Sequence, residues 1–179
     1  MTKSRPNLIL IGMPGAGKST VGVILAKRTS RGFVDTDVLI QTSQSRTLQE
    51  IVDEDGYIAL RRIEEETLLD LSVQNHVIAT GGSAVYSKPA MAYLKSIGLV
   101  VFLKVGLAVL QSRVHDFETR GLAKRPDQSF AELFEERMGL YTAYADITIR
   151  CAGLNQEEIC SKIIKKETAK SGTRLNTDL

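Results

Sequence analysis

The amino-acid sequence predicts an α/β fold in which a five-stranded parallel sheet is flanked by helices, and three observations support this prediction. Five short apolar runs fall at residues 8–11, 33–35, 77–79, 99–103 and 147–149. Their nearly continuous apolar character is typical of strands that are buried on both faces. Helical patterns separate the runs, and strands that alternate with helices are joined by right-handed crossovers into a parallel sheet.

The length and composition of the chain suit a single domain. Its 179 residues are 43% hydrophobic, which is enough for one α/β core and too little for two domains of usual size. We expect one domain over residues 1–170 and a flexible tail over residues 171–179. The helical patterns lie at residues 18–29, 47–53, 58–72, 88–96, 107–114, 130–144 and 155–166.

Composition argues against several classes of partner. With a formal net charge of +2 and no tryptophan, the chain has no basic stripe with interleaved aromatic residues, so we expect no nucleic-acid binding. No apolar run has the length of a membrane span or a signal peptide. Cys151 and Cys160 lack C-x-x-C spacing and a nearby histidine, which indicates neither a disulfide framework nor a zinc site. These features favour a cytoplasmic protein without a membrane partner.

The strongest functional signal is a glycine-rich motif directly after the first apolar run. Residues 12–19 read Gly-Met-Pro-Gly-Ala-Gly-Lys-Ser and match the phosphate-loop pattern G-x-x-x-x-G-K-[ST] at every fixed position. Glycines let backbone amides curl around a polyphosphate, and the N-terminus of the following helix attracts the same anion. We expect ATP to be bound by Gly12, Gly15, Ala16, Gly17, Lys18, Ser19 and Thr20.

Two aspartates after the second apolar run are expected to complete the phosphate site. Lys18 can bridge the terminal phosphates, and the Ser19 hydroxyl is placed to ligate Mg²⁺. Only the strand at 33–35 has acids at its tip, where Asp35 would hold Mg²⁺ through water and Asp37 would lie beside an acceptor hydroxyl. The two carboxylates share one side if the extended geometry persists past the strand. The alternative is that they are only turn and helix-cap residues.

The remaining strands disfavour two large classes of phosphate-loop protein. The third run is followed by Thr-Gly-Gly at residues 80–82 and the fourth by Lys104, so neither has the acid expected in a motor or AAA-type ATPase. A GTPase needs an N-K-x-D motif, which the sequence lacks. The D-x-x-G at residues 53–56 follows a helical pattern, so we interpret it as coincidental.

Three further segments have both a functional and a purely structural interpretation. Residues 115–129 form a long charged loop that suits a lid, although disorder without function would also explain it. Arg61 and Glu65 lie one helical turn apart, and a surface ion pair alone would explain them. The Gly-Gly-Ser at residues 81–83 either forms a tight turn or brings backbone amides to a small polar ligand.

Taken together, these motifs resemble those of the shikimate kinase family, whose members are small monomeric kinases with the P-loop NTPase fold. The resemblance covers residues 7–160. It comprises, in chain order, the phosphate loop, the triplet Asp35-Thr36-Asp37, Arg61 with Glu64, the turn at residues 81–83, and Arg137 four residues before Tyr141.

The resemblance implies an acceptor site for a small carboxylic acid. Asp37 would bind acceptor hydroxyls and help to orient the attacking oxygen. Arg61 and Arg137 would clamp the carboxylate, and the backbone amides of Gly81 and Gly82 would contact the same molecule. Arginine forks suit carboxylates, so two of them would select an anionic acceptor over a neutral sugar.

The resemblance also assigns roles on the nucleotide side. Arg120 resembles the lid arginine that reaches the transferring phosphate, and Arg125 is a second candidate for that role. Arg113 resembles an arginine that stacks on adenine, and residues 150–154 resemble the adenine-binding loop. The catalytic residues would then be Lys18, Asp37 and Arg120.

Four departures from the family pattern fall on the acceptor side and the lid. Leu60 replaces the aromatic residue before the first clamp arginine, and Ser83 replaces the third glycine of the turn. Residues 120–123 read Arg-Gly-Leu-Ala where the family lid usually reads Arg-Pro-Leu-Leu. Met-Gly at residues 138–139 replaces the usual proline near Arg137. The nucleotide side is therefore better supported than the identity of the acceptor.

The activity implied is transfer of the γ-phosphoryl group of ATP, with Mg²⁺, to a hydroxyl of shikimate, which gives shikimate 3-phosphate in aromatic amino-acid biosynthesis. We expect a monomeric enzyme whose partner is a small-molecule acceptor. Two alternatives stay open at this point. One is a kinase of another small acceptor, such as gluconate or a nucleoside monophosphate, and the other is a non-catalytic nucleotide-binding regulatory module.

Overall fold

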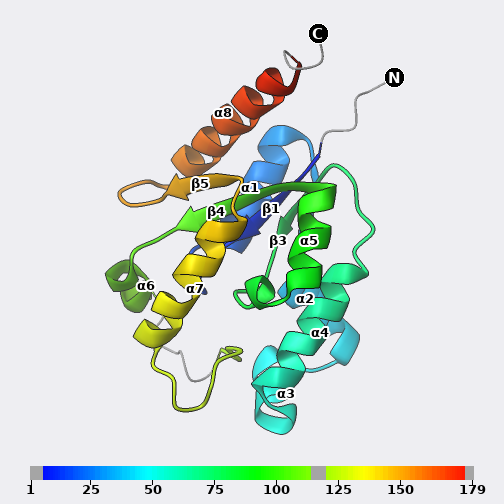
Figure 1. Ribbon diagram of the computed structural model, residues 1–179, viewed down its shortest axis with the longest axis vertical. Helices are drawn as coiled ribbons and strands as arrows, with labels where there is room; N and C mark the ends of the chain where they lie inside the picture. The colour runs from blue at the N-terminus through cyan, green and yellow to red at the C-terminus, as the bar shows by residue number, and fades with distance from the viewer. Residues whose placement is uncertain (1–5, 114–119, 176–179) are drawn as a thin grey trace.

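The apolar runs form one parallel sheet at the centre of the molecule (Figure 1). The computed structural model describes residues 6–113 and 120–175. The strand order is β2-β3-β1-β4-β5, and all the pairings are parallel. The five predicted strands are confirmed as β1 (Asn7–Ile11), β2 (Gly32–Asp35), β3 (His76–Ala79), β4 (Gly98–Lys104) and β5 (Ile147–Arg150).

The central strand β1 is buried along its whole length, with Leu8 facing Val77 on β3 and Leu99 on β4. Asn7 begins this strand and joins its two neighbours. Its side-chain amide donates to the carbonyl oxygen of Ile97 at 3.2 Å and accepts from the backbone amide of His76 at 2.8 Å. The amino ends of three strands are thus held level at this edge of the sheet.

Helices cover both faces of this sheet (Figure 1). α1 and α8 pack together on one face, while α5 and α7 contact β4 on the other. Right-handed crossovers place helices on both faces of this sheet, because the chain moves one way across it from β1 to β2 and the opposite way from β3 to β4. The helices are α1 (Lys18–Thr29), α2 (Thr36–Gln44), α3 (Leu48–Asp55), α4 (Tyr57–Leu69), α5 (Lys88–Ile97), α6 (Leu107–Arg113), α7 (Phe130–Tyr144) and α8 (Gln156–Leu175), with a 3₁₀ turn η1 (Ala84–Tyr86).

Helix α2 corrects the prediction for the segment after β2. Asp35 and Asp37 share one side only if extended geometry persists past the strand, and this condition is not met, because the strand ends at Asp35 and a helix begins at Thr36. The Asp35 carboxylate accepts hydrogen bonds from the amides of Asp37 at 3.0 Å and Val38 at 3.4 Å. Asp35 is therefore the N-cap of α2, as the alternative interpretation states. Its hydrogen bonds satisfy amides that have no partner within the helix.

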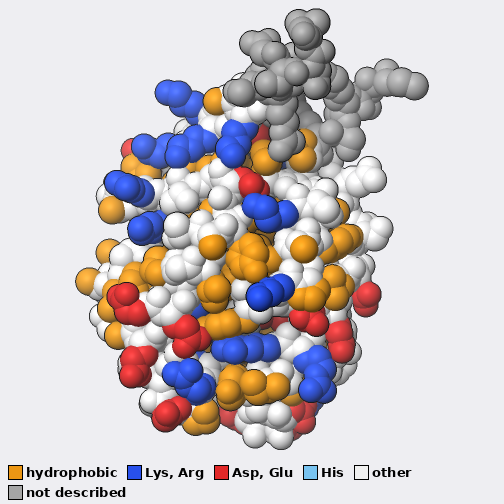
Figure 2. All heavy atoms as spheres, viewed as in Figure 1, with side chains coloured by type: hydrophobic (Ala, Val, Ile, Leu, Met, Phe, Trp, Pro, Cys, Tyr) orange, Lys and Arg blue, Asp and Glu red, His pale blue; other side chains and the backbone are white. Residues whose placement is uncertain are grey.

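Helix α8 is longer than predicted. It continues to Leu175, well past the expected end at residue 166, and so includes the first part of the tail expected over residues 171–179. Its sequence holds no proline, which allows the helix to continue. Residues 176–179 lie outside the described residues. Figure 2 shows basic side chains gathered over α8, while acidic side chains are more frequent in the lower half of the molecular face that it shows.

A second, smaller hydrophobic cluster lies beside the main core and builds the lobe formed by α2, α3 and α4. Its buried members are Ile40, Ile51, Leu60 and Ala123. Ala123 reaches this cluster from residues 120–129, the described part of the predicted lid loop. The loop is thus packed onto the lobe at this point.

Among the described residues, no helix is both long and apolar enough to span a membrane.

Candidate active site

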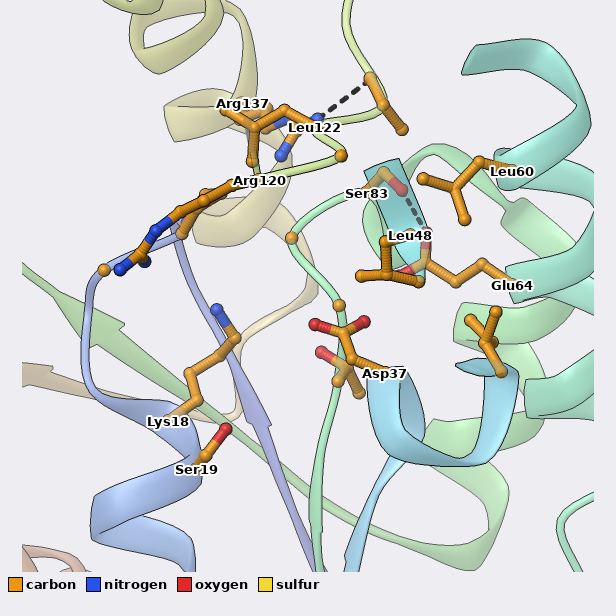
Figure 3. A pocket seen from close by; sticks show the side chains of 18 of the residues that line it. Lys18, Ser19, Asp37, Leu48, Leu60, Glu64, Ser83, Arg120, Leu122 and Arg137 are labelled. Carbon is orange, nitrogen blue, oxygen red and sulfur yellow. Dashed lines mark hydrogen bonds between the residues drawn. The ribbon is translucent and has the colours of Figure 1, made fainter. Parts of the chain in front are cut away.

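A pocket of about 380 Å³ opens at the carboxyl ends of the strands, which is where ligands bind in open parallel sheets. Five segments line it: the phosphate loop with the start of α1, the α2–α4 lobe, the turn after β3, residues 120–123, and α7. Figure 3 shows the labelled side chains converging on the pocket from these segments. Both halves of the predicted site therefore face one cavity.

The phosphate loop has a conformation that its glycines make possible. Gly12 has φ 149°, and a Cβ there would lie 2.9 Å from the carbonyl oxygen of Leu103. Gly17 has φ 90° and is the N-cap of α1, which leaves the first helical amides free to bind an anion. The strand, loop and helix thus follow each other as the motif predicts.

Lys18 lies inside the concave loop. Its ammonium group donates to the carbonyl oxygens of Gly12 at 2.8 Å and Met13 at 3.0 Å. Burial lowers the pKa of Lys18 to about 8, although the nearby Asp37 carboxylate acts in the opposite direction. The side chain points into the pocket (Figure 3), where a bound polyphosphate would favour the charged form.

Ser19 and Asp35 lie together, as expected for residues that serve one Mg²⁺ ion. The Ser19 hydroxyl donates to the Asp35 carboxylate at 2.5 Å. The donor set fits this metal, because Mg²⁺ is held by a few hard oxygen ligands that it shares with phosphates and water. Within the described part of the chain, no three His, Cys, Asp or Glu residues form a metal cluster. An all-protein metal cage is thus not built from those residues.

Asp37 lies in the first turn of α2, between Lys18 and Glu64 in the pocket (Figure 3). Burial raises the pKa of its carboxyl group, and the neighbouring Lys18 opposes this rise. A Cβ on Gly81 would lie 2.8 Å from the Asp37 carboxylate. The space beside this carboxylate therefore depends on glycine at position 81.

The glycine turn after β3 is held to the elements around it. The Gly81 amide donates to the hydroxyl of Thr36 at 3.2 Å, and the Tyr141 hydroxyl donates to the carbonyl oxygen of Gly82 at 2.6 Å. A Cβ on Gly82 would lie 2.7 Å from the guanidinium group of Arg137. The turn thus allows functional side chains to approach the backbone, which favours the ligand-binding interpretation of these glycines.

Glu64 is a pocket residue whose role sequence reasoning did not assign, although the family motif includes it. Its side chain is buried and accepts a hydrogen bond from Ser83, the residue that departs from the family pattern. Burial and the adjacent Asp37 carboxylate raise the pKa of Glu64 to about 7. The other carboxylate oxygen, Oε1, has no hydrogen-bond partner among the described residues. This carboxyl group can therefore gain or lose a proton near neutral pH.

The two predicted clamp arginines converge on one oxygen atom. Arg61 on α4 donates from Nη2 to the Ala123 carbonyl oxygen at 3.0 Å, and Arg137 on α7 donates from Nη2 to the same oxygen at 3.1 Å. An ion pair between Arg61 and Glu65 is not found among the described residues, and Glu65 instead accepts a hydrogen bond from Ser87. The surface-pair interpretation of Arg61 is therefore wrong.

The three other arginines with a predicted nucleotide-side role lie in different surroundings. Arg120 lines the pocket on the side of Lys18 (Figure 3). Arg125 is not among the lining residues and contacts the Glu136 carboxylate at 3.5 Å, so the geometry favours Arg120 as the lid arginine. Arg113 ends α6 and donates to the Gly15 carbonyl oxygen at 3.4 Å. Of the predicted lid, residues 115–119 lie outside the described residues.

Arg113 also lies close to the segment expected to bind adenine. Burial raises the pKa of the Cys151 thiol to about 11, and the positive charge of Arg113 acts against this rise. Cys151 follows β5 and donates its backbone amide to the carbonyl oxygen of Lys104 at 3.0 Å. Arg113 is thus near both the phosphate loop and residues 150–154, as its predicted role requires.

Comparison with known proteins gives a consistent result. The family model for shikimate kinase matches residues 14–168. Shikimate kinases of Thermosynechococcus vestitus and Thermodesulfovibrio yellowstonii are 38% and 36% identical to the chain over 163 residues, which is 89% of this chain and 88% and 94% of those proteins. The structure of the Acinetobacter baumannii shikimate kinase in complex with shikimate matches with a TM-score of 0.86 and 31% identity over 93% of this chain and 94% of that one. The chain therefore belongs to the shikimate kinase family.

Proposed function

We propose that this chain transfers the γ-phosphoryl group of ATP to the 3-hydroxyl of shikimate. Family membership establishes an ATP-dependent kinase that phosphorylates a hydroxyl group. The observation that carries the choice of acceptor is the convergence of Arg61 and Arg137 on one carbonyl oxygen, at 3.0 Å and 3.1 Å. Two guanidinium groups that share an oxygen ligand suit an acceptor with a carboxylate, since arginine binds carboxylates through forked, charge-assisted hydrogen bonds.

The nucleotide half acts by holding and neutralising the polyphosphate. The backbone amides of the loop and of the first turn of α1 bind the phosphates, and Lys18 lies against the terminal ones. Phosphoryl transfer needs little covalent chemistry from the protein, so positioning and charge stabilisation account for most of the rate. The binding set is Gly12, Gly15, Ala16, Gly17, Lys18, Ser19 and Thr20.

The acceptor half fixes the orientation of the hydroxyl that receives the phosphoryl group. Arg61 and Arg137 bind the carboxylate, while the backbone amides of Gly81 and Gly82 contact the ring substituents. Asp37 accepts a hydrogen bond from the attacking hydroxyl and directs its oxygen toward the phosphate. This role suits its place in the pocket, where it lies beside Lys18.

Ser19 and Asp35 are the residues that would hold Mg²⁺ with ATP, Ser19 through its hydroxyl and Asp35 through water. When bound, the ion would supply positive charge next to the phosphate oxygens. The 2.5 Å hydrogen bond between the two side chains supports a shared site. In this proposal, the carboxylate also caps α2, so one side chain links the metal site to the helix that carries Asp37.

Arg120 and Arg113 complete the nucleotide side of the proposal. Arg120 approaches the transferring phosphate from the lid and stabilises charge there, and Arg113 stacks on adenine beside residues 150–154. Packing of the loop at residues 120–123 over both ligands excludes water and suppresses hydrolysis of ATP. Support comes from Arg120, which lines the same pocket as Lys18.

We also propose that the enzyme acts as a monomer in the cytoplasm. Residues of this chain line both halves of the pocket, which supports a site that one subunit completes. Both cysteines are free and buried, which suits a reducing compartment. Light scattering coupled to size exclusion tests the monomer, because a dimeric mass at working concentration would contradict it.

The decisive experiment is a coupled assay of ADP release with a panel of acceptors. We expect acceptor-dependent ADP release with shikimate and little with gluconate or a nucleoside monophosphate. The methyl ester of shikimate is the matched control, because it keeps every hydroxyl and loses the charged carboxylate. Faster turnover with gluconate or a nucleotide, or nucleotide binding without acceptor-dependent ADP release, would overturn the proposal.

A further inference from the structure

The geometry points to Tyr86 as a positioning residue that holds both carboxylate-binding arginines in place and joins them to the base of the lid. This inference rests on the proposed function, because it concerns the acceptor site of that reaction. Tyr86 is the last residue of η1, directly after the glycine turn. Tyr86 belongs to none of the sequence motifs and has no predicted role.

The backbone that carries Tyr86 is firmly held. Ala84 and Val85 precede it and are both buried in the main core. The Tyr86 amide donates to the carbonyl oxygen of Ser83 at 3.0 Å, which closes the 3₁₀ turn. Tyr86 itself belongs to neither hydrophobic cluster of the described residues. Its ring therefore serves contacts other than core packing.

The first of these contacts is with Arg61. The centre of its guanidinium group lies 3.7 Å from the centroid of the Tyr86 ring and 5.1 Å from that of the Tyr57 ring. Arg61 Nε is buried and has no hydrogen-bond partner among the described residues. The orientation of this guanidinium group is consequently set by the two aromatic rings and by the hydrogen bond that Nη2 donates to the Ala123 carbonyl oxygen.

The second contact is with Arg137. Its Nε donates to the Tyr86 hydroxyl at 3.4 Å, and its guanidinium centre lies 5.3 Å from the ring centroid. The same hydroxyl donates its proton to the carboxylate of Glu136, the neighbour of Arg137 on α7. A phenol hydroxyl has one donor and can accept as well, so both capacities are used here. One side chain thus contacts both arginines.

The third contact extends from Glu136 into the lid loop. The Glu136 carboxylate accepts hydrogen bonds from the Gln128 side chain at 2.7 Å and from Arg125 at 3.5 Å. Gln128 is buried although it lies in the loop. Tyr86 is therefore linked through Glu136 to the base of the segment whose Ala123 carbonyl oxygen receives both arginines.

The aromatic surface against Arg61 does not come from the residue before it in the sequence. Leu60 occupies the aromatic position before Arg61, and its side chain is buried in the small cluster of the α2–α4 lobe. The aromatic surface against Arg61 comes instead from Tyr57 and Tyr86. We infer that Tyr86 supplies, from the glycine turn, the planar contact that holds the arginine in its binding orientation.

The test compares Tyr86→Leu, which removes stacking and the hydroxyl, with Tyr86→Phe, which removes the hydroxyl alone. We expect KM for shikimate to rise about tenfold in Tyr86→Leu and about threefold in Tyr86→Phe, because stacking and hydrogen bonding each contribute to the orientation of the clamp. The dissociation constant for ATP, measured by calorimetry, should change less than about twofold in both. The ratio of kcat/KM for shikimate to kcat/KM for its methyl ester should fall in both variants, and it should fall further in Tyr86→Leu.

The matched control is Tyr93→Phe, since the Tyr93 hydroxyl donates to the carbonyl oxygen of Leu71, away from the pocket lining. KM for shikimate should not change in this variant. The inference would be overturned if KM for shikimate did not change in Tyr86→Phe. It would also be overturned if Tyr86→Leu lost affinity for ATP as much as for shikimate. If Tyr86→Leu does not fold, Tyr86→Phe decides alone. If the wild-type enzyme does not phosphorylate shikimate, the proposed function itself fails.

Discussion

The nucleotide half and the acceptor half of the pocket are built in different ways. The phosphate-binding part of the nucleotide half is one continuous segment, from β1 through the loop to α1, and its ligand groups are mainly backbone amides. The acceptor half is assembled from α2, α4, the turn after β3, residues 121–123 and α7, and its ligand groups are mainly side chains. A continuous backbone site can be recognised from a short motif, whereas an assembled site depends on contacts between distant residues.

The two halves also differ in how their charged groups are held. Lys18 donates to backbone carbonyl oxygens of the loop that it belongs to. Arg61 and Arg137 are oriented by Tyr86 and by the Ala123 carbonyl oxygen, which come from other parts of the chain. Changes in the acceptor half should therefore alter which molecule is bound, while changes in the nucleotide half should alter the rate for every acceptor.

The largest effect should come from the nucleotide half. We expect Lys18→Ala to lower kcat by on the order of 10²- to 10³-fold, because it removes a buried cation at the place where transferred charge develops. The measurement is steady-state ADP release with saturating shikimate. Lys27→Ala, in the last turn of the same helix and exposed, is the control that should keep its rate. Equal rates for the wild type and Lys18→Ala would exclude the proposed phosphate site.

A somewhat smaller loss should separate the two lid candidates. Arg120→Ala should lower kcat about 10²-fold, since Arg120 lines the pocket on the side of Lys18. Arg125→Ala should lower it no more than a few-fold, because that side chain contacts Glu136 and is absent from the pocket lining. Single-turnover rates with both ligands bound make the comparison. The opposite ranking would make Arg125 the lid arginine.

The acceptor half should respond through KM. Arg61→Ala should raise KM for shikimate about 10- to 100-fold, because charge-assisted hydrogen bonds to a carboxylate contribute about 1.5–3 kcal/mol. The dissociation constant for ATP should stay within about twofold. Arg62→Ala, its exposed neighbour on α4, is the control and should leave both values unchanged. Loss of ATP affinity in Arg61→Ala would contradict the division of the pocket into two halves.

The sequence predicts the nucleotide half well, because the motif itself defines the backbone path. The strands, α1 and the placement of Lys18 and Ser19 follow from periodicity and from the phosphate-loop pattern. No helix is predicted between the strand at residues 33–35 and the helical pattern at residues 47–53, so the sequence misses α2 (Thr36–Gln44). The hydrogen bonds that the amides of residues 37 and 38 donate to the Asp35 carboxylate mark the start of this helix, and they decide in favour of the helix-cap alternative.

The acceptor half could be predicted only as a set of resemblances. Arg61 and Arg137 are 76 positions apart in the sequence, and nothing local states that they approach one oxygen atom. The role of Tyr86 has no sequence signal at all, since a tyrosine after a glycine turn is also compatible with ordinary core packing. The pairing of Ser83 with Glu64 likewise depends on a tertiary contact. Side-chain networks of this kind become visible only when the fold brings their members together.

The smallest expected effect concerns the stability of the acceptor half. Burial and Asp37 raise the pKa of Glu64 from 4.5 to about 7, while Ser83, Arg137 and Lys18 act in the opposite direction. The folded state therefore binds an extra proton between these two values, and the free energy of unfolding falls as pH rises through about 7. This contribution should therefore be smaller at pH 8 than at pH 5.

Glu64→Gln isolates that contribution, because the amide oxygen can still accept the hydrogen bond from Ser83 and no longer titrates. Urea unfolding between pH 5 and pH 8 should show a shallower fall in unfolding free energy for the variant than for the wild type. Glu65→Gln, one position along α4, should keep the wild-type slope, since Glu65 does not line the pocket. Parallel curves for the wild type and Glu64→Gln would show that folding does not change proton binding at this carboxyl group, which would exclude the raised pKa.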